Sequence, residues 1–336
     1  MGMLQERGTV RNIARGAGVA TGVTGAAALG WTVYSRFFVN HHRRLYSALE
    51  APLHHVRTRA AGRLAYYVDR GDGGPPLVLL HSINAAASSA EMRPLFDLYR
   101  GTRTVFSLDL PGFGFSEREP REYTPELYTG AITEFLASEV RAPADIIALS
   151  FSSEFAARVA LARPELVRSL ALISPTGFSH SPRAGAPAFL RTFTVPPFSQ
   201  AFYDLLVTQR SIRYYLKKSF TGPVDERLAR YAYDTAHQPG ARHAPLQFLA
   251  GVPFTRSVLH DVYRNITVPA VVLYDCDAYV DFGRLDMLLR ARGNWRARRI
   301  PNTCGLPHFD RPEDTAAALD EFWREVTSAG SRSAVH

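Results

Sequence analysis

A serine flanked by small residues stands at position 150, where a buried apolar run gives way to a helical pattern. Residues 146–153 read IIALSFSS, so Ala148 and Ser152 lie two positions on either side of Ser150. Small neighbours permit a sharp strand-to-helix turn that exposes a serine hydroxyl. The helix N-terminus behind it would offer unpaired N–H groups to developing negative charge, with the Phe151 N–H as one donor. This pattern predicts a nucleophilic Ser150; a plain serine at such a junction is the alternative.

A second polar segment follows another apolar run, at residues 79–84 with the sequence LLHSIN. In a parallel sheet its backbone would lie beside Ser150, and we expect the Ile83 N–H to be the second oxyanion donor. His81 is expected to be a hydrogen-bonded scaffold residue rather than a catalyst.

These two segments and the tight glycine turn of residues 109–116, DLPGFGFS, occur in an order and spacing that resemble the α/β-hydrolase superfamily. The resemblance covers about residues 60 to 325. Within the superfamily, this part of the chain is similar to the lidded esterase, epoxide-hydrolase and dehalogenase-like members. Epoxide hydrolases and dehalogenases would require an aspartate nucleophile, so Ser150 favours the esterase-like branch. The resemblance implies an α/β-hydrolase fold: a mostly parallel, doubly wound sheet with an inserted helical lid.

The resemblance also implies an acid after the next-to-last strand, where residues 274–280 read YDCDAYV. Asp277 fits the family position best. Asp275 and Asp281 stay open as alternatives for the carboxylate that orients the base.

The base itself departs from the family pattern, which has a Gly-His pair followed by x-Pro-His. Residues 304–310 read CGLPHFD, so the expected histidine looks deleted. A loop one residue shorter could carry His308 toward Ser150, and His308 is the predicted base. A packing histidine in a protein without a conventional triad is the alternative, because a serine with no base nearby is a poor nucleophile.

These residues must be positioned by the strands and helices around them. From residue 64 onward, short apolar runs alternate with helical patterns, which is typical of a parallel sheet covered on both faces. The runs lie at residues 64–68, 77–81, 105–110, 146–150, 170–174 and 271–274, with a weaker one at 296–300. Asp310 and Glu313 form a capping box that predicts a closing helix over residues 315–326.

The alternation stops within an aromatic, proline-punctuated segment that we expect to be the lid. The predicted organisation is an arm or membrane anchor at 1–44, core at 45–177, lid at 178–265, core at 266–328 and a tail at 329–336. The many lid aromatics favour a small hydrophobic acyl or alkyl substrate.

The amino-acid composition is ordinary except at the N-terminus, and it constrains the function of the protein only weakly. The net charge of +8 comes from dispersed arginines without a dense basic tract, which argues against nucleic-acid binding. Residues 16–34 are uncharged and long enough for one membrane span, although rich in Gly and Ala. An arm lying on the protein body is the alternative, so the sequence leaves membrane-associated and cytoplasmic locations open. It does not fix the oligomeric state.

We therefore expect a serine hydrolase acting on an ester, thioester or similar acyl bond of a hydrophobic substrate, with neither a cofactor nor a metal. A catalytically silent or non-hydrolytic relative that binds an apolar ligand or partner is the competing hypothesis.

Overall fold

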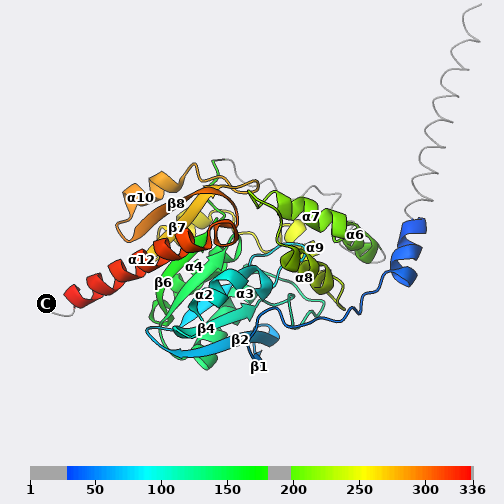
Figure 1. Ribbon diagram of the computed structural model, residues 1–336, viewed down its shortest axis with the longest axis horizontal. Helices are drawn as coiled ribbons and strands as arrows, with labels where there is room; N and C mark the ends of the chain where they lie inside the picture. Colours follow the sequence, from blue (N-terminus) through cyan, green and yellow to red (C-terminus); the bar gives the residue numbers. More distant parts are fainter. Residues whose placement is uncertain (1–28, 181–197, 334–336) are drawn as a thin grey trace, which may run out of the picture.

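A computed structural model describes residues 29–180 and 198–333 of the chain. Its centre is an eight-stranded sheet in the order β1-β2-β4-β3-β5-β6-β7-β8 (Figure 1). The strands are β1 (Leu53–Thr58), β2 (Gly62–Asp72), β3 (Leu77–Leu80), β4 (Arg103–Asp109), β5 (Ala144–Leu149), β6 (Val167–Ile173), β7 (Ala270–Cys276) and β8 (Trp295–Cys304).

Strands β3 to β8 pair in parallel, whereas β1 and β2 form antiparallel pairs at one edge. The carboxyl ends of the parallel strands therefore meet at one edge, where loops can bring side chains together. The expected mostly parallel sheet is confirmed, and β1 is an additional strand that the apolar runs do not reveal.

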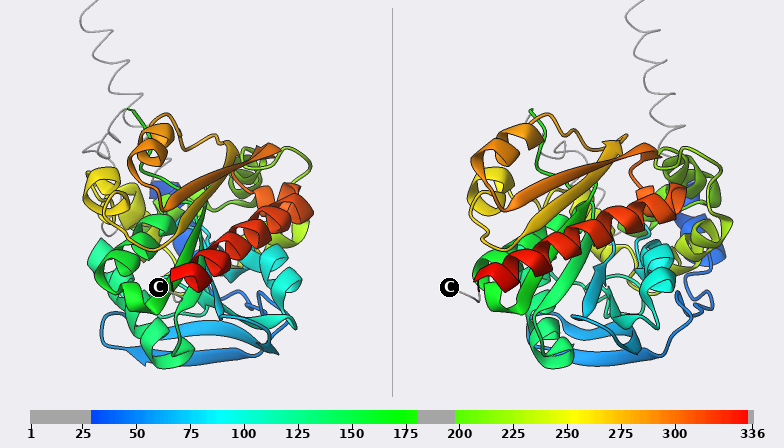
Figure 2. Two further views of the ribbon diagram at one scale, coloured as in Figure 1. Left: turned by 90° about the vertical axis from the view of Figure 1, so that its left-hand side faces the viewer. Right: turned by 60° about the vertical axis from the view of Figure 1, so that its left-hand side comes forward.

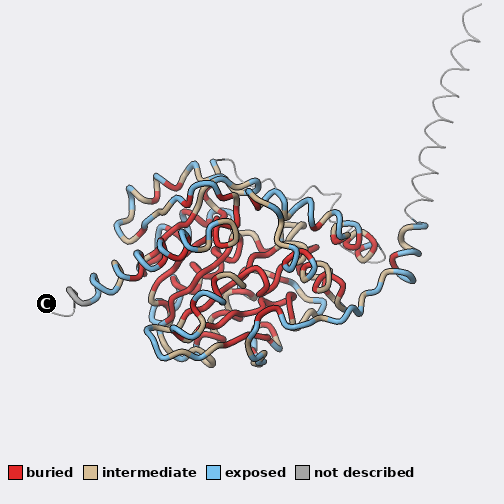
Figure 3. The backbone as a smooth tube through the Cα atoms, in the orientation of Figure 1, coloured by how far each residue is buried: buried red, intermediate tan, exposed pale blue. Residues whose placement is uncertain are grey.

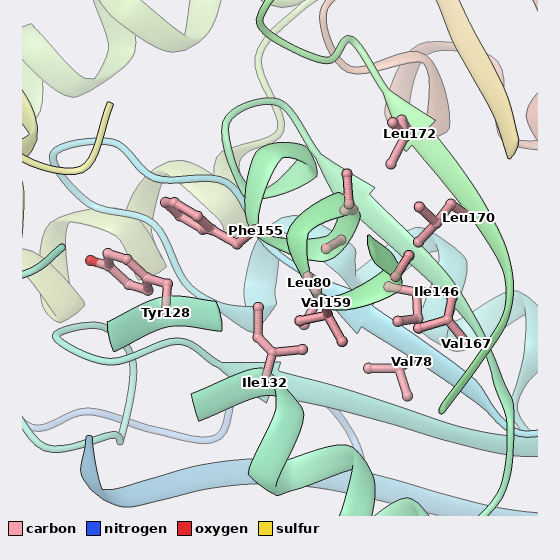
Figure 4. Packing of buried hydrophobic residues seen from close by; sticks show 14 of the residues in the cluster. Val78, Leu80, Tyr128, Ile132, Ile146, Phe155, Val159, Val167, Leu170 and Leu172 are labelled. Carbon is pink, nitrogen blue, oxygen red and sulfur yellow. The ribbon is translucent and has the colours of Figure 1, made fainter. Parts of the chain in front are cut away.

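Helices cover both faces of the sheet, and Figure 2 shows α12 (Pro312–Ser333) lying across one of them. Val78, Leu80 and Ile146 point to the face covered by α3 (Pro125–Phe135) and α4 (Ser152–Ala162) (Figure 4). The alternate residues Leu77, Leu79 and Ile147 pack toward the opposite face, with α2 (Arg93–Tyr99) and α12. Both faces of each central strand are thus buried, which is why these strands read as continuous apolar runs.

A helical insert joins β6 to β7 at the carboxyl edge of the sheet (Figure 1). Its helices are α6 (Ser199–Leu206), α7 (Gln209–Lys217), α8 (Glu226–Ala236) and α9 (His243–Leu249). It has a small apolar cluster of its own, which includes Tyr203, Val207 and Ile212. The predicted insert is present in the described residues; residues 181–197 of the predicted lid lie outside them.

The C-terminal part of the chain adds α10 (Leu285–Ala291) between β7 and β8, and the short α11 (Pro307–Asp310) before α12. The closing helix is confirmed, and it begins at Pro312, three residues before the predicted start at residue 315. The Asp310 carboxylate accepts hydrogen bonds from the Thr221 N–H of the insert.

The arm before the sheet contacts the insert. Residues 29–38 are helical, and the segment from 39 to 50 runs along the insert toward β1 (Figure 3). The Trp31 indole N–H donates to Ala201 O at 2.7 Å. Ser35 Oγ donates to the buried Asp204 carboxylate at 2.6 Å, which His41 Nε2 also contacts at 2.9 Å.

Part of the predicted membrane anchor, residues 16–28, lies outside the described residues. Among the residues that the structure describes, no helix is both long enough and apolar enough to cross a bilayer. The described part of the arm packs on the protein body, as the alternative interpretation of the sequence expects, while Phe37 and Phe38 are about 70% exposed (72% and 71%).

Candidate active site

Ser150 lies on a strained turn between β5 and α4. Its φ angle is +54°, a left-handed value that is costly for residues other than glycine. The Ser150 N–H donates to Ile173 O of β6 at 2.7 Å, and its carbonyl accepts from the Ser153 N–H at 3.2 Å. The neighbouring strand and the following helix together hold this conformation, as a strand-to-helix nucleophile turn requires.

The small residues around this turn are fully buried. Ser152 stands where glycine is usual in such turns, and its hydroxyl donates to Leu149 O at 2.9 Å. Ser153 Oγ donates to Ala148 O at 3.2 Å. Both hydroxyls are therefore satisfied inside the turn, which explains how the chain accommodates serine there.

A cavity of about 360 Å³ opens over Ser150, at the carboxyl edge of the sheet beneath the insert. Its core-side lining includes Ser150, Ile83, Phe151 and Asp277. The insert contributes mostly apolar side chains: Leu206, Ile212, Tyr215, Leu216, Leu228, Ala232, Phe248 and Leu249.

The two predicted oxyanion donors are available for a ligand. Neither the Ile83 N–H nor the Phe151 N–H makes a hydrogen bond to a described residue. Phe151 immediately precedes α4, so its N–H adds to the positive end of the helix dipole. Both residues line the same cavity as Ser150.

His81 is the scaffold residue that the sequence predicts. Its side chain is fully buried, with Nδ1 2.6 Å from Ser82 O and Nε2 accepting from the Leu110 N–H at 2.9 Å. The ring thus fixes the end of β3 against the end of β4.

Glu91 lines the candidate site, although no sequence pattern points to it. Its carboxylate accepts from the Ser82 N–H at 2.8 Å and from Asn84 Nδ2 at 2.7 Å. These bonds hold the loop that carries Ile83. Glu91 is only 6% exposed and lines the cavity, and only the tertiary structure brings it to this loop.

We expect Glu91→Ala to lower the rate of any reaction that uses the Ile83 N–H by about 100-fold, because a displaced oxyanion donor stabilises the transition state poorly. Glu91→Gln is the matched control: it keeps one oxygen for the Ser82 N–H and should lose much less. The measurement is kcat/KM for an ester substrate. Equal rates for the alanine variant and wild type would show that this loop does not hold an oxyanion.

Of the three competing acids, Asp277 alone lines the cavity. Its Oδ1 accepts from the N–H groups of Tyr279 and Val280 at 2.7 and 3.1 Å, and burial raises the pKa of the carboxyl.

The other two acids are engaged elsewhere. Burial by itself raises the pKa of the Asp275 carboxyl. The hydrogen bond that this carboxylate accepts from Arg299 Nε at 2.6 Å acts in the opposite direction, and the pKa lies below its usual value. Asp281 is exposed and accepts from the Gly283 N–H at 2.8 Å.

His308 lies outside the cavity, which corrects the expectation that it approaches Ser150. It is fully buried at the start of α11, and its Nε2 donates to Glu91 O at 2.8 Å. Its Nδ1 has no hydrogen-bond partner among the described residues. The ring therefore contacts neither Ser150 nor Asp277 through a hydrogen bond, and its position is that of a packing histidine.

Burial lowers the pKa of His308 to about 4. Because an unfolded histidine titrates near 6.5, acid protonates the unfolded chain first, and His308 destabilises the fold as pH falls from about 6.5 to 4. The full penalty is roughly 3 kcal/mol. We expect His308→Gln to lack this component, measured as the pH dependence of the free energy of unfolding relative to wild type. Parallel pH profiles for the two proteins would contradict the buried, neutral state.

Gly305, rather than His308, lies beside the acid. It has φ +85°, and a Cβ added to it would lie 3.0 Å from Asp277 Oδ2. The Gly305 N–H donates to Cys276 O at 3.1 Å, which joins the two loops. The histidine is therefore not simply deleted: a residue without a side chain occupies the position next to Asp277.

Known proteins agree with this architecture. The sequence model of the alpha/beta hydrolase family matches residues 77–318, which is most of the chain. The protein therefore belongs to the α/β-hydrolase family.

The individual proteins that match the chain share less than 30% of its residues over the aligned length. A 2-hydroxymuconate semialdehyde hydrolase of Pseudomonas sp. (strain CF600) is 26% identical over 285 residues, covering 80% of this chain and 94% of the relative. An acetyltransferase component of the acetoin cleaving system of Cupriavidus necator is 29% identical over 121 residues. This match spans 35% of this chain and 31% of that protein.

The fold also matches solved structures. A bacterial membrane phospholipase A superposes with a TM-score of 0.64 at 21% identity, covering 95% of this chain and 97% of that one. At this identity the likeness concerns the fold.

Proposed function

We propose that this protein hydrolyses an ester, thioester or similar acyl bond of a hydrophobic substrate, with Ser150 as the nucleophile. The observation that carries the proposal is the strained turn, which presents Ser150 to a mostly apolar cavity. Membership of the α/β-hydrolase family and the hydrolase name of the Pseudomonas relative support the reaction class.

In the proposed reaction, Ser150 Oγ gives up its proton as it bonds to the acyl carbon, and the carbonyl oxygen becomes negatively charged; the proton later passes to the leaving alcohol or thiol. The N–H groups of Ile83 and Phe151 then stabilise this oxyanion, assisted by the N-terminus of α4. Collapse of the tetrahedral intermediate releases the alcohol or thiol and leaves an acyl-enzyme, which water hydrolyses.

The lining of the cavity supports an apolar acyl group. Leucine, isoleucine and phenylalanine side chains of the insert face the space above Ser150. Burying each additional methylene contributes about 0.8 kcal/mol, provided that the chain fits.

We therefore expect kcat/KM for p-nitrophenyl esters to rise about three- to fourfold per methylene from acetate until the cavity is full. Ala232→Phe, which places a ring in the lining contributed by α8, should shorten the preferred acyl chain. The measurement is the chain-length profile of both proteins. A flat profile in wild type, or an unchanged one in the variant, would refute an acyl site in this cavity.

A second candidate is a binding protein that holds an apolar ligand without turnover. Gly305 beside Asp277 favours it, because no histidine is among the described residues that line the cavity. Incubating the protein with a fatty acyl ester distinguishes the two functions. A hydrolase releases alcohol and acid, whereas a binding protein retains the intact ester stoichiometrically.

A further inference from the structure

Two carboxylates line the cavity: Glu91, which the Ser82 N–H and Asn84 Nδ2 engage, and Asp277, which has no basic neighbour. Both backbone hydrogen bonds to Asp277 reach Oδ1, while Oδ2 is the oxygen nearest to Gly305. None of the described residues that line the cavity is a lysine, arginine or histidine. Since a carboxylate in a largely apolar space is costly unless it is paired, this arrangement favours a ligand that brings a basic group.

The position beside Oδ2 cannot easily be filled by the chain itself. Gly305 has a left-handed φ of +85°, which disfavours any other residue, and a Cβ there would be 3.0 Å from Asp277 Oδ2 and 3.5 Å from Ser219 Cβ. Ser150, Asp277 and Gly305 nevertheless line one continuous cavity. A ligand in that cavity can therefore reach both the nucleophile and the carboxylate.

We propose that the substrate of the proposed hydrolase carries a weak nitrogen base, such as an imidazole, in its acyl portion, and that this base binds Asp277 and accepts the Ser150 proton. The inference rests on the proposed function and names its substrate class: an amphipathic acyl compound with an apolar chain and one basic nitrogen. The acyl portion must carry the base, because the same base is needed again after the alcohol or thiol has left.

The proton balance is closed. As the bond from Oγ to the acyl carbon forms, the Oγ proton moves to the unprotonated nitrogen of the imidazole, while the N–H of its other ring nitrogen donates to Asp277. The resulting cation pairs with the carboxylate, and its proton passes to the leaving alcohol or thiol as that bond breaks. The neutral base then takes a proton from the attacking water, and returns it to Ser150 when the acyl-enzyme is released.

Imidazole added from solution tests this proton acceptor. With a fluorophosphonate probe, the bond from Oγ to phosphorus forms, the bond from phosphorus to fluorine breaks, fluoride leaves, and imidazole takes the proton. We expect imidazole to accelerate labelling of Ser150 at least tenfold and in a saturable manner. In Asp277→Asn the saturable acceleration should be lost, whereas the exposed Asp281→Asn should respond like wild type.

A binding measurement separates this inference from the hydrolase proposal. In Ser150→Ala, decylamine should raise the melting temperature more than decanol, and Asp277→Asn in the same background should remove the difference. Labelling that occurs without imidazole and is not accelerated by it, together with equal effects of decylamine and decanol, overturns the inference while the hydrolase proposal stands. Selective decylamine binding without labelling at any imidazole concentration overturns the proton transfer and the hydrolase proposal together.

Discussion

Ser150→Ala is expected to lower ester hydrolysis by roughly 1,000-fold or more, because the variant has no atom to form the acyl-enzyme. The oxyanion donors and the apolar cavity are retained, so substrate binding should change little. The measurement is kcat and KM for the preferred p-nitrophenyl ester with imidazole added as the proton acceptor, and the melting temperature is recorded to show that the variant is folded.

Ser153→Ala is the matched control. It removes a hydroxyl from the first turn of α4, three residues after Ser150, but that hydroxyl donates to Ala148 O, and Ser153 does not line the cavity. This variant should retain most of the activity. If Ser150→Ala hydrolysed the ester as fast as wild type, the reaction would take place elsewhere.

Asp145→Ala is expected to lower the free energy of unfolding by about 3–5 kcal/mol, because it leaves buried charges without their partner. Asp145 is fully buried at the start of β5. Its carboxylate accepts from Arg103 Nη2 at 2.6 Å, Arg168 Nη1 at 2.8 Å and Ser169 Oγ at 2.5 Å. Urea or thermal unfolding measures the change.

Glu165→Gln is the control for this stability prediction. It breaks an ion pair with Arg163 in which both side chains are exposed, and surface pairs of this kind contribute little. We expect no measurable change in this variant. A loss of similar size in both variants would mean that burial does not set the strength of the Asp145 interactions.

The sheet and the strand-to-helix turn at Ser150 could be predicted because their signals are local. Continuous apolar runs mark the strands that are covered on both faces, and the small residues around Ser150 lie within the turn itself. The strand β1 gives no such signal, because it is an edge strand whose sequence LHHVRT is largely exposed or half-buried. Edge strands need little apolar patterning.

The site residues after β7 and β8 depended on tertiary contacts that the sequence does not contain. Three carboxylates lie within seven residues, and only the fold turns Asp277 into the cavity while Arg299 engages Asp275. Spacing alone suggested that a shortened loop carries His308 toward Ser150. Instead α11 directs its Nε2 to Glu91 O, a bond between segments 217 residues apart.

The most direct test of the account is to locate the adduct after wild-type protein reacts with a fluorophosphonate, by peptide mass spectrometry, with and without imidazole. The account predicts a single modified residue, Ser150, whose modification is faster with imidazole present. A folded protein that acquires no adduct under either condition, or one modified at another serine while Ser150 stays free, would contradict it.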